Sequence, residues 1–186
     1  MGADEILFEV EEKMETAVEF LRKEFRGIRT GRASSGLVEH IKVNYYGAPT
    51  DLRQLATIAT PEAALIVIKP FDPNSLREIE RAIQASELGV TPSTDGKVIR
   101  LALPPLSMER RQHLVAQIKK MAEAARVTVR NARRDGNKDI EHQEKASELT
   151  EDEARKGKEE TQKLTEKYEK LVNDILDAKT AEIQER

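Results

Sequence analysis

Apolar residues recur every three or four positions over residues 4–29 of the chain. Glutamate and lysine fill the positions between them, so a helix here would bury one stripe and leave the rest solvated. The apolar positions are Ile6, Val10, Met14, Ala17, Leu21, Phe25 and Ile28. The pattern ends at Gly31, which predicts that the first helix ends before this glycine.

Short stretches between residues 36 and 103 have the character of strands instead. Apolar side chains alternate at Ile41, Val43 and Tyr45, as in a half-buried strand. Residues 46–49 (Tyr-Gly-Ala-Pro) predict a turn. Residues 64–68 are continuously apolar and predict a buried strand that stops at Pro70, and residues 98–103 predict a closing strand after the Asp95-Gly96 turn. A capping box from Ser75 to Glu78 predicts a short helix that ends near Gly89.

Helical periodicity returns after Pro104-Pro105 and continues to about residue 145. Ser107 is placed to cap this helix. Its apolar side comprises Ile118, Met121, Ala122, Ala125, Val129 and Ala132. A second capping box, from Thr150 to Glu153, predicts the start of a last helix. The apolar seam of that helix comprises Leu164, Tyr168, Leu171, Ile175 and Ala178. Gly136 and Gly157 should each cost about 1 kcal/mol relative to alanine inside these helices, and the pattern offers no reason for either.

The three amphipathic helices predict a bundle, because none can bury its stripe alone. The expected fold class is α+β: an elongated three-helix bundle with an inserted small β/α/β domain. The bundle would comprise residues 1–30 and 106–186, and the inserted domain residues 31–105. Both passages between these domains contain residues that break regular structure, Gly31 in one and Pro104-Pro105 in the other.

Composition limits the possible functions. The chain has no cysteine, which excludes disulfides and thiolate metal sites. It has no apolar run of the roughly 20 residues that a membrane helix needs, so we expect a cytosolic, cytoplasmic protein. The net charge is −3, but residues 110–138 contain nine lysines and arginines against two acids, a net charge of +7. Such asymmetry predicts one surface that attracts anions.

The basic side chains of this segment are concentrated on one side of the predicted helix. Lys119, Arg126, Arg130 and Arg133 fall within roughly 60° of one another at about 100° per residue, with Arg134 and Lys138 beside them. Residues 124–134 contain four arginines and no acid, whereas an ordinary solvated helix face mixes both signs. Arginine binds phosphate oxygens through two parallel hydrogen bonds. The row therefore predicts binding of nucleic acid or another polyanion.

Catalytic and cofactor sites are not indicated by the sequence. Residues 89–97 resemble a phosphate-binding loop, but the spacing is too long and Val98 stands where serine or threonine is required. The histidines, at positions 40, 113 and 142, lack metal-ligand spacing, and the acidic residues from 144 to 153 fit helix capping and solvation. Tyr45 and Tyr46 are expected to pack across strands rather than to stack on bases. We expect no enzyme, no metal and no cofactor.

Several motifs, spread over essentially the whole chain, resemble the bacterial ribosome recycling factor family. They are Ile28-Arg29-Thr30-Gly31-Arg32-Ala33-Ser34, Tyr45-Tyr46-Gly47-Ala48-Pro49-Thr50, Leu52-Arg53-Gln54-Leu55-Ala56, Ala85-Ser86-Glu87-Leu88-Gly89, Leu103-Pro104-Pro105-Leu106 and residues 126–135 (Arg-Val-Thr-Val-Arg-Asn-Ala-Arg-Arg-Asp). The resemblance implies an L-shaped molecule in which the bundle and the β/α/β domain are joined by a hinge.

The resemblance also implies a function. Such a factor binds the large ribosomal subunit across the tRNA sites after termination. With elongation factor G and GTP, it promotes separation of the two subunits. The RNA-contacting motif of the family falls on Arg130, Arg133 and Arg134, and the hinge on Thr30-Gly31-Arg32 and Leu103-Pro104-Pro105. Gly136 departs from the family, in which alanine is frequent. We expect a monomer that contacts rRNA and elongation factor G, and no membrane.

Two other functions are weighed against this one. A structural or chaperone-like coiled-coil protein would bind partner helices, and it predicts spare apolar surface with no row of charges of one sign. An enzyme with a site in the small domain would hydrolyse or transfer a group on its own. The arginine row counts against the first alternative, and the absence of a catalytic constellation in the sequence counts against the second.

Overall fold

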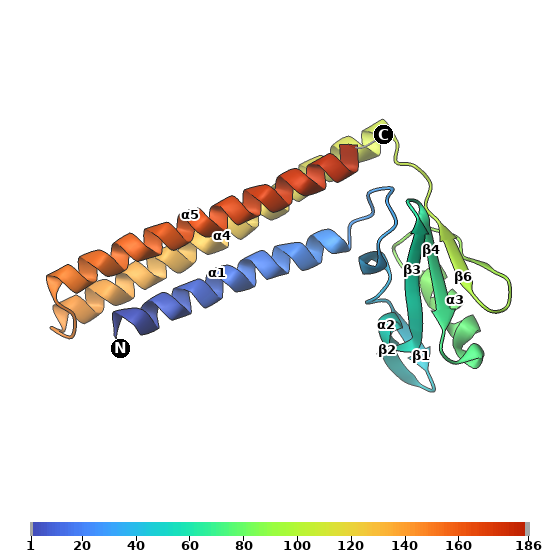
Figure 1. Ribbon diagram of the computed structural model, residues 1–186, viewed down its shortest axis with the longest axis horizontal. Coiled ribbons are helices and arrows are strands. Elements are labelled where there is room, and N and C mark those ends of the chain that lie inside the picture. The colour runs from blue at the N-terminus through green and yellow to red at the C-terminus, as the bar shows by residue number, and fades with distance from the viewer. Residues whose placement is uncertain (1, 185–186) are drawn as a thin grey trace. The chain divides into compact units, whose positions relative to one another are not determined.

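The computed structural model describes residues 2–184 and divides into two compact units (Figure 1). One unit joins the residues up to Phe25 with those from His113 onward, and the other comprises Arg26–Gln112. The boundaries predicted from the sequence, after residues 30 and 105, lie inside the second unit. The predicted fold class, a helical bundle with a small inserted domain of strands and helices, is confirmed.

The first unit consists of three long helices, α1 (Ala3–Arg26), α4 (Met108–Lys145) and α5 (Glu151–Gln184), without the last residue of α1 and the first five residues of α4. Side-chain contacts fix their directions. Arg126 of α4 binds Asn173 of α5, while Lys158 of α5 binds Glu141 of α4, so these two helices are antiparallel. Lys167 of α5 also binds Glu11, which holds α1 against α5. Each helix thus buries one stripe against the other two.

The stripe predicted for α1 is confirmed from Ile6 to Phe25, but the helix ends at Arg26 and Ile28 lies beyond it. In α4, every predicted stripe position except Met121 is buried. The seam predicted for α5 is partly wrong. Its buried positions are Ala154, Gly157, Thr161, Thr165, Tyr168, Val172 and Ile183, whereas Ala178 is exposed. An apolar pattern missed the two threonines because their side chains are polar.

The buried threonines of α5 satisfy their hydroxyl groups locally. Thr165 donates to the main-chain oxygen of Thr161 at 2.8 Å, and Thr161 donates to Asn137 Oδ1 of α4 at 2.7 Å. A buried hydroxyl with a hydrogen-bond partner avoids the cost of desolvation without compensation. The methyl group of each threonine remains free to pack in the bundle, which explains how these residues occupy core positions.

The two helical glycines lie at close approaches between helices. A Cβ atom at Gly136 would overlap Cγ2 of Val10 on α1, and a Cβ atom at Gly157 would lie 3.0 Å from Cδ1 of Ile140 on α4. Both glycines are buried. The packing at Gly136 therefore leaves no room for a side chain, and a side chain at Gly157 would require the end of Ile140 to shift. These close approaches explain two positions that the pattern left without a reason.

The second unit contains two antiparallel sheets (Figure 1). Strands β1 (Lys42–Tyr45) and β2 (Ala48–Asp51) form a hairpin. The larger sheet has the strand order β3-β4-β6-β5 and comprises β3 (Ala56–Glu62), β4 (Leu65–Pro70), β6 (Ile99–Ala102) and β5 (Ser93–Thr94). The remaining elements are α2 (Leu52–Leu55), α3 (Leu76–Ala85) and two 3-10 turns, Ser35–Leu37 and Pro73–Ser75. Ile66, Ile68, Ile79, Ile99 and Leu101 form the centre of the core.

The hairpin turn is shorter than predicted. Only Tyr46 and Gly47 form it, with φ angles of 49° and 84°, and Ala48 and Pro49 already belong to β2. Two consecutive positive φ angles match the right-handed twist of a hairpin. Tyr45 packs against the core of this unit, whereas Tyr46 is 80% exposed in the turn. Their rings meet edge to face at 4.6 Å, and both hydroxyl groups donate to Asp72 Oδ2.

The predicted capping box at Ser75 is wrong. Ser75 makes no side-chain cap for α3, and its hydroxyl donates instead to the main-chain oxygen of Asp72 at 2.6 Å. Asp72 caps the preceding 3-10 turn by accepting from the Asn74 N–H at 2.9 Å. The prediction failed because Pro73 starts a turn that displaces the true cap by three residues. The capping box at Thr150 is confirmed, since Glu153 accepts from the Thr150 N–H at 2.8 Å and Thr150 Oγ1 accepts from the Glu153 N–H.

Candidate RNA-binding surface

Helix α4 supports the basic side chains as one uninterrupted element. It begins after Ser107, whose Oγ accepts from the Arg110 N–H at 3.2 Å, as the sequence predicts. The helix then continues for 38 residues. At 1.5 Å per residue, positions 119 and 138 lie roughly 28 Å apart along its axis. The basic side chains between them are therefore distributed along a straight line on one rigid element.

The side chain of Arg126 is 19% exposed, against 40% for Arg130. Its Nε and Nη2 both donate to Asn173 Oδ1 of α5, at 3.0 and 2.6 Å. Its Nη1 donates to Glu123 Oε2 at 2.9 Å. The guanidinium group is thus held against α5, and it offers fewer free N–H groups to a ligand than its neighbours do.

Arg130 lies one turn further along α4 and is 40% exposed. Its Nε donates to Glu169 Oε1 of α5 at 2.7 Å, and its Nη1 donates to Glu123 Oε1 at 3.2 Å. The hydrogen bond to Glu169 raises the pKa of Arg130, and the one from Arg126 lowers the pKa of Glu123. Arg130 and Glu123 are therefore charged at neutral pH, and two carboxylates fix the position of the Arg130 guanidinium group.

Arg133 donates from Nη1 to Gln162 Oε1 of α5 at 2.8 Å. Lys119, Arg134 and Lys138 are exposed, and no hydrogen bond or ion pair within residues 2–184 involves their side chains. The structure therefore brings the predicted residues onto one helix but divides them into two kinds. Arg126, Arg130 and Arg133 are braced by α5, whereas the other three project into solvent.

Residues 124–134 contain no acid, but acids outside this segment contact its arginines. Glu123 and Glu169 both reach Arg130, so part of the positive charge is compensated. Sequence reasoning missed the contribution of α5, namely Gln162, Glu169 and Asn173. Their spacings of seven and four residues put them on one face of that helix, and this spacing could be read from the sequence. The register that sets this face against the arginines could not be read from the sequence.

The residues predicted as a hinge lie within the second unit. Gly31 has a φ angle of +81°, which favours glycine, and Thr30 is buried. Leu103 donates from its N–H to the main-chain oxygen of Ala64 at 2.8 Å. Arg29 donates from Nη2 to the main-chain oxygen of Pro104 at 3.0 Å, so the two chain passages are bonded to each other.

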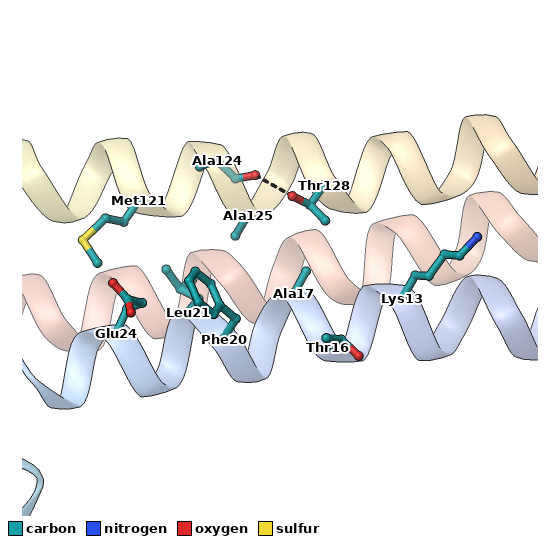
Figure 2. A pocket seen from close by; sticks show the side chains of 10 residues that line it. All are labelled: Lys13, Thr16, Ala17, Phe20, Leu21, Glu24, Met121, Ala124, Ala125 and Thr128. Carbon is teal, nitrogen blue, oxygen red and sulfur yellow. Dashed lines mark hydrogen bonds between the residues drawn. The ribbon is translucent and has the colours of Figure 1, made fainter. Parts of the chain in front are cut away.

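A groove of about 360 Å³ lies between α1 and α4 (Figure 2). Phe20 and Leu21 of α1 and Met121 and Ala124 of α4 contribute to its mostly apolar wall. The arginines that bridge α4 to α5 do not line it. Helix α4 therefore presents two separate features, a basic row braced by α5 and an apolar groove shared with α1.

Within the described part of the chain, no three histidine or acidic side chains are grouped so that they could hold a metal ion. The same residues include no helix that is both long and apolar enough to cross a bilayer. The fold and the surface together define a class of protein: a helical bundle with an inserted small domain and a row of guanidinium groups along one helix of the bundle.

Comparison with known proteins gives the family. The family model described as "Ribosome recycling factor" matches residues 21–183. The ribosome-recycling factor of Halalkalibacterium halodurans is 51% identical over 97% of this chain and 98% of its own length. That of Synechococcus sp. (strain JA-2-3B'a(2-13)) is 49% identical over 95% of this chain and 97% of its own. The chain belongs to the ribosome recycling factor family.

Solved structures agree with this assignment. The solution structure of a ribosome recycling factor has a TM-score of 0.79 and 45% identity, covering 97% of this chain and 96% of the other. A second structure describes the T. thermophilus ribosome recycling factor and the E. coli elongation factor G bound to the E. coli post-termination complex. It has a TM-score of 0.71 and 36% identity, and covers both chains completely.

The family decides between the functions that the sequence left open. Ribosome recycling factors are translation factors without enzymatic activity, which supports the main interpretation rather than an enzyme or a coiled-coil structural protein. The function of the chain in protein biosynthesis is ribosome recycling.

Proposed function

We propose that this protein binds the rRNA of the large ribosomal subunit in the cytoplasm through the basic row of α4. With elongation factor G and GTP it then promotes separation of the subunits of the post-termination ribosome. The RNA-binding residues in this proposal are Arg130, Arg133 and Arg134, with Arg126, Lys119 and Lys138 at the edges of the row.

One observation supports the proposal above the others: guanidinium and ammonium groups line one rigid helix of the described chain. Phosphate groups of a nucleic acid backbone recur at regular intervals, so a straight row of cations can contact several of them at once. Arg133 and Arg134 are central because each keeps most of its N–H groups free for phosphate oxygens.

We assign the hydrolysis of GTP to elongation factor G. Residues 89–97 contain the short strand β5 (Ser93–Thr94) and do not open a helix. A phosphate-binding loop of an NTPase leads into a helix whose N-terminus contacts the phosphates. The free energy for subunit separation would therefore come from the partner, and this protein would transmit it.

Transmission needs a flexible connection, and we propose that the chain bends between the two compact units. In this proposal the hinge comprises Thr30, Gly31, Arg32, Leu103, Pro104 and Pro105, which lie outside helices and strands and include the positive φ angle of Gly31. These residues, with the irregular backbone beside them at 27–29 and 106–107, would absorb the changes in backbone angle. Two parallel passages allow bending while they limit free rotation.

The proposal is tested by co-sedimentation of Arg133→Ala with purified large subunits over a series of salt concentrations. Loss of one charge-assisted contact worth about 1.5 kcal/mol should weaken binding roughly tenfold. The slope of log affinity against log salt should become shallower by about one unit or less. Arg155→Ala is the matched control, since Arg155 is an exposed arginine of α5 that pairs with Asp152. Equal affinity and slope for Arg133→Ala and the wild type would overturn the proposal.

A further inference from the structure

Helix α5 supplies one hydrogen-bond acceptor to each of the three braced arginines of α4. Asn173 accepts from Arg126, Glu169 from Arg130 and Gln162 from Arg133, at distances between 2.6 and 3.0 Å. We call these three residues of α5 the acceptor row. The helices are antiparallel, so the acceptor numbers fall as the arginine numbers rise, and the contacts repeat along the interface.

The three residues of the acceptor row differ in charge but share one kind of hydrogen-bonding atom. Asn173 and Gln162 are neutral amides, and only Glu169 is an acid. If the purpose of these contacts were to neutralise the arginines, three acids would serve better. The shared property is a planar oxygen acceptor at one edge of the guanidinium group.

The contacts leave a large part of the guanidinium groups of Arg130 and Arg133 free. An arginine has five N–H groups. Arg130 uses one on Glu169 and one on Glu123, and its side chain remains 40% exposed. Arg133 uses one on Gln162. The remaining N–H groups are available to a ligand while the bonded edge prevents the side chain from rotating.

We propose that Gln162, Glu169 and Asn173 are positioning residues, which hold the arginines of α4 in the orientation that meets the phosphates of rRNA. This inference rests on the proposed function and adds a role for α5 in it. A long side chain that is already ordered loses less rotamer entropy on binding, and immobilising one such side chain costs a factor of about 2 to 12 in affinity. The acceptor row orders the arginine side chains in the free protein, so this entropy is not lost when the protein binds the ribosome.

Two variants of Glu169 separate positioning from charge. Glu169→Ala removes both the acceptor and the negative charge, whereas Glu169→Gln removes the charge and keeps an acceptor, as Gln162 does for Arg133. Simple electrostatics predicts that both variants bind rRNA more tightly, because each gains one positive unit. Positioning predicts that Glu169→Ala binds large subunits about 2- to 12-fold more weakly. It also predicts that Glu169→Gln binds as well as the wild type or better.

The control for charge is Asp174→Ala, because Asp174 is an exposed acid of α5 with no hydrogen bond or ion pair to another side chain within residues 2–184. This variant should bind with unchanged or higher affinity. Gln162→Ala provides a second arm that alters no charge, and it should also weaken binding. Circular dichroism before each titration establishes that the helices are intact.

A double-mutant cycle shows whether Glu169 acts through Arg130. Glu169→Ala should weaken binding in the wild type and should no longer weaken it once Arg130→Ala is present. Tighter binding by both Glu169 variants, or unchanged binding by Glu169→Ala and Gln162→Ala, would overturn the inference. If Arg133→Ala leaves binding unchanged, the proposed function itself fails. If Arg133→Ala weakens binding and Glu169→Ala does not, only the role of the acceptor row fails.

Discussion

The close approach of α1 to α4 at Gly136 makes a quantitative prediction about stability. A Cβ atom at this position would overlap Cγ2 of Val10, which is itself 3% exposed. Gly136→Ala should gain about 1 kcal/mol from helix propensity. It should lose about 1–3 kcal/mol from overpacking. The expected net result is a destabilisation of about 1 kcal/mol, opposite in sign to an ordinary Gly→Ala change in a helix.

The same substitution should change sign when Val10 is shortened. In Val10→Ala, the space that the valine methyl groups occupied is open, so Gly136→Ala should stabilise the bundle by about 1 kcal/mol. The coupling energy between the two positions is then about 2 kcal/mol, within the range for residues in contact. Urea unfolding of the four proteins, followed by circular dichroism, measures it. Gly157→Ala is the comparison, because its Cβ atom would meet only the flexible end of Ile140, at 3.0 Å, and the cost of packing should be smaller.

Additivity would refute this reasoning. If Gly136→Ala stabilises the protein by about 1 kcal/mol both with and without Val10→Ala, the two helices do not touch at this level. The glycine would then have no packing role, and its presence in a long helix would again lack an explanation.

Three further predictions concern other parts of the chain. Thr150→Ala should destabilise the bundle by about 1 kcal/mol in urea unfolding, because it removes the capping box of α5. The control is Ser147→Ala, at an exposed serine that makes no such contacts. The N–H groups of Val98 and Lys97, with Arg100, lower the pKa of Asp95 to about 2. The Asp95 carboxylate therefore stabilises the fold above its ordinary pKa of 3.8, and this stabilisation is lost as the pH falls from 3.8 through about 2. Asp95→Asn should flatten the acid limb of unfolding over that window, and an NMR titration of Asp95 with a midpoint near 4 would contradict the assignment. A variant with two glycines inserted after Gly27 and two after Pro105 should bind large subunits with nearly unchanged affinity, but light scattering should show markedly less subunit splitting with elongation factor G and GTP. The same insertion at the exposed turn of Gly96 should reduce neither affinity nor splitting. Normal splitting by the first variant would exclude a role for the chain passages between the two units.

Periodicity in the sequence was sufficient to locate the long helices and three of the six strands in the described residues, β1, β4 and β6. The stripe of α1, the Ser107 and Thr150 caps and the buried strand β4 are all properties of residues that lie within a few positions of one another. Strand β3 was not predicted, because it lies at an edge of its sheet and consists mainly of small and polar residues with a proline. Such a strand buries little and shows no alternation.

The sequence of α4 was also sufficient to place the arginines on one helix beside its apolar stripe, because their relative angles follow from the pitch of the helix. Anion binding by this row stays a prediction. The hydrogen-bond partners of those arginines were not predictable from the sequence. Whether Arg130 faces solvent alone or meets Glu169, 39 residues away, depends on the register between α4 and α5. That register is set by packing at positions such as Gly136 and Thr161, where side-chain volume rather than hydrophobicity decides which helices can approach. Local pattern thus determined the elements and their charge, and only the tertiary structure decided which side chains of different helices meet.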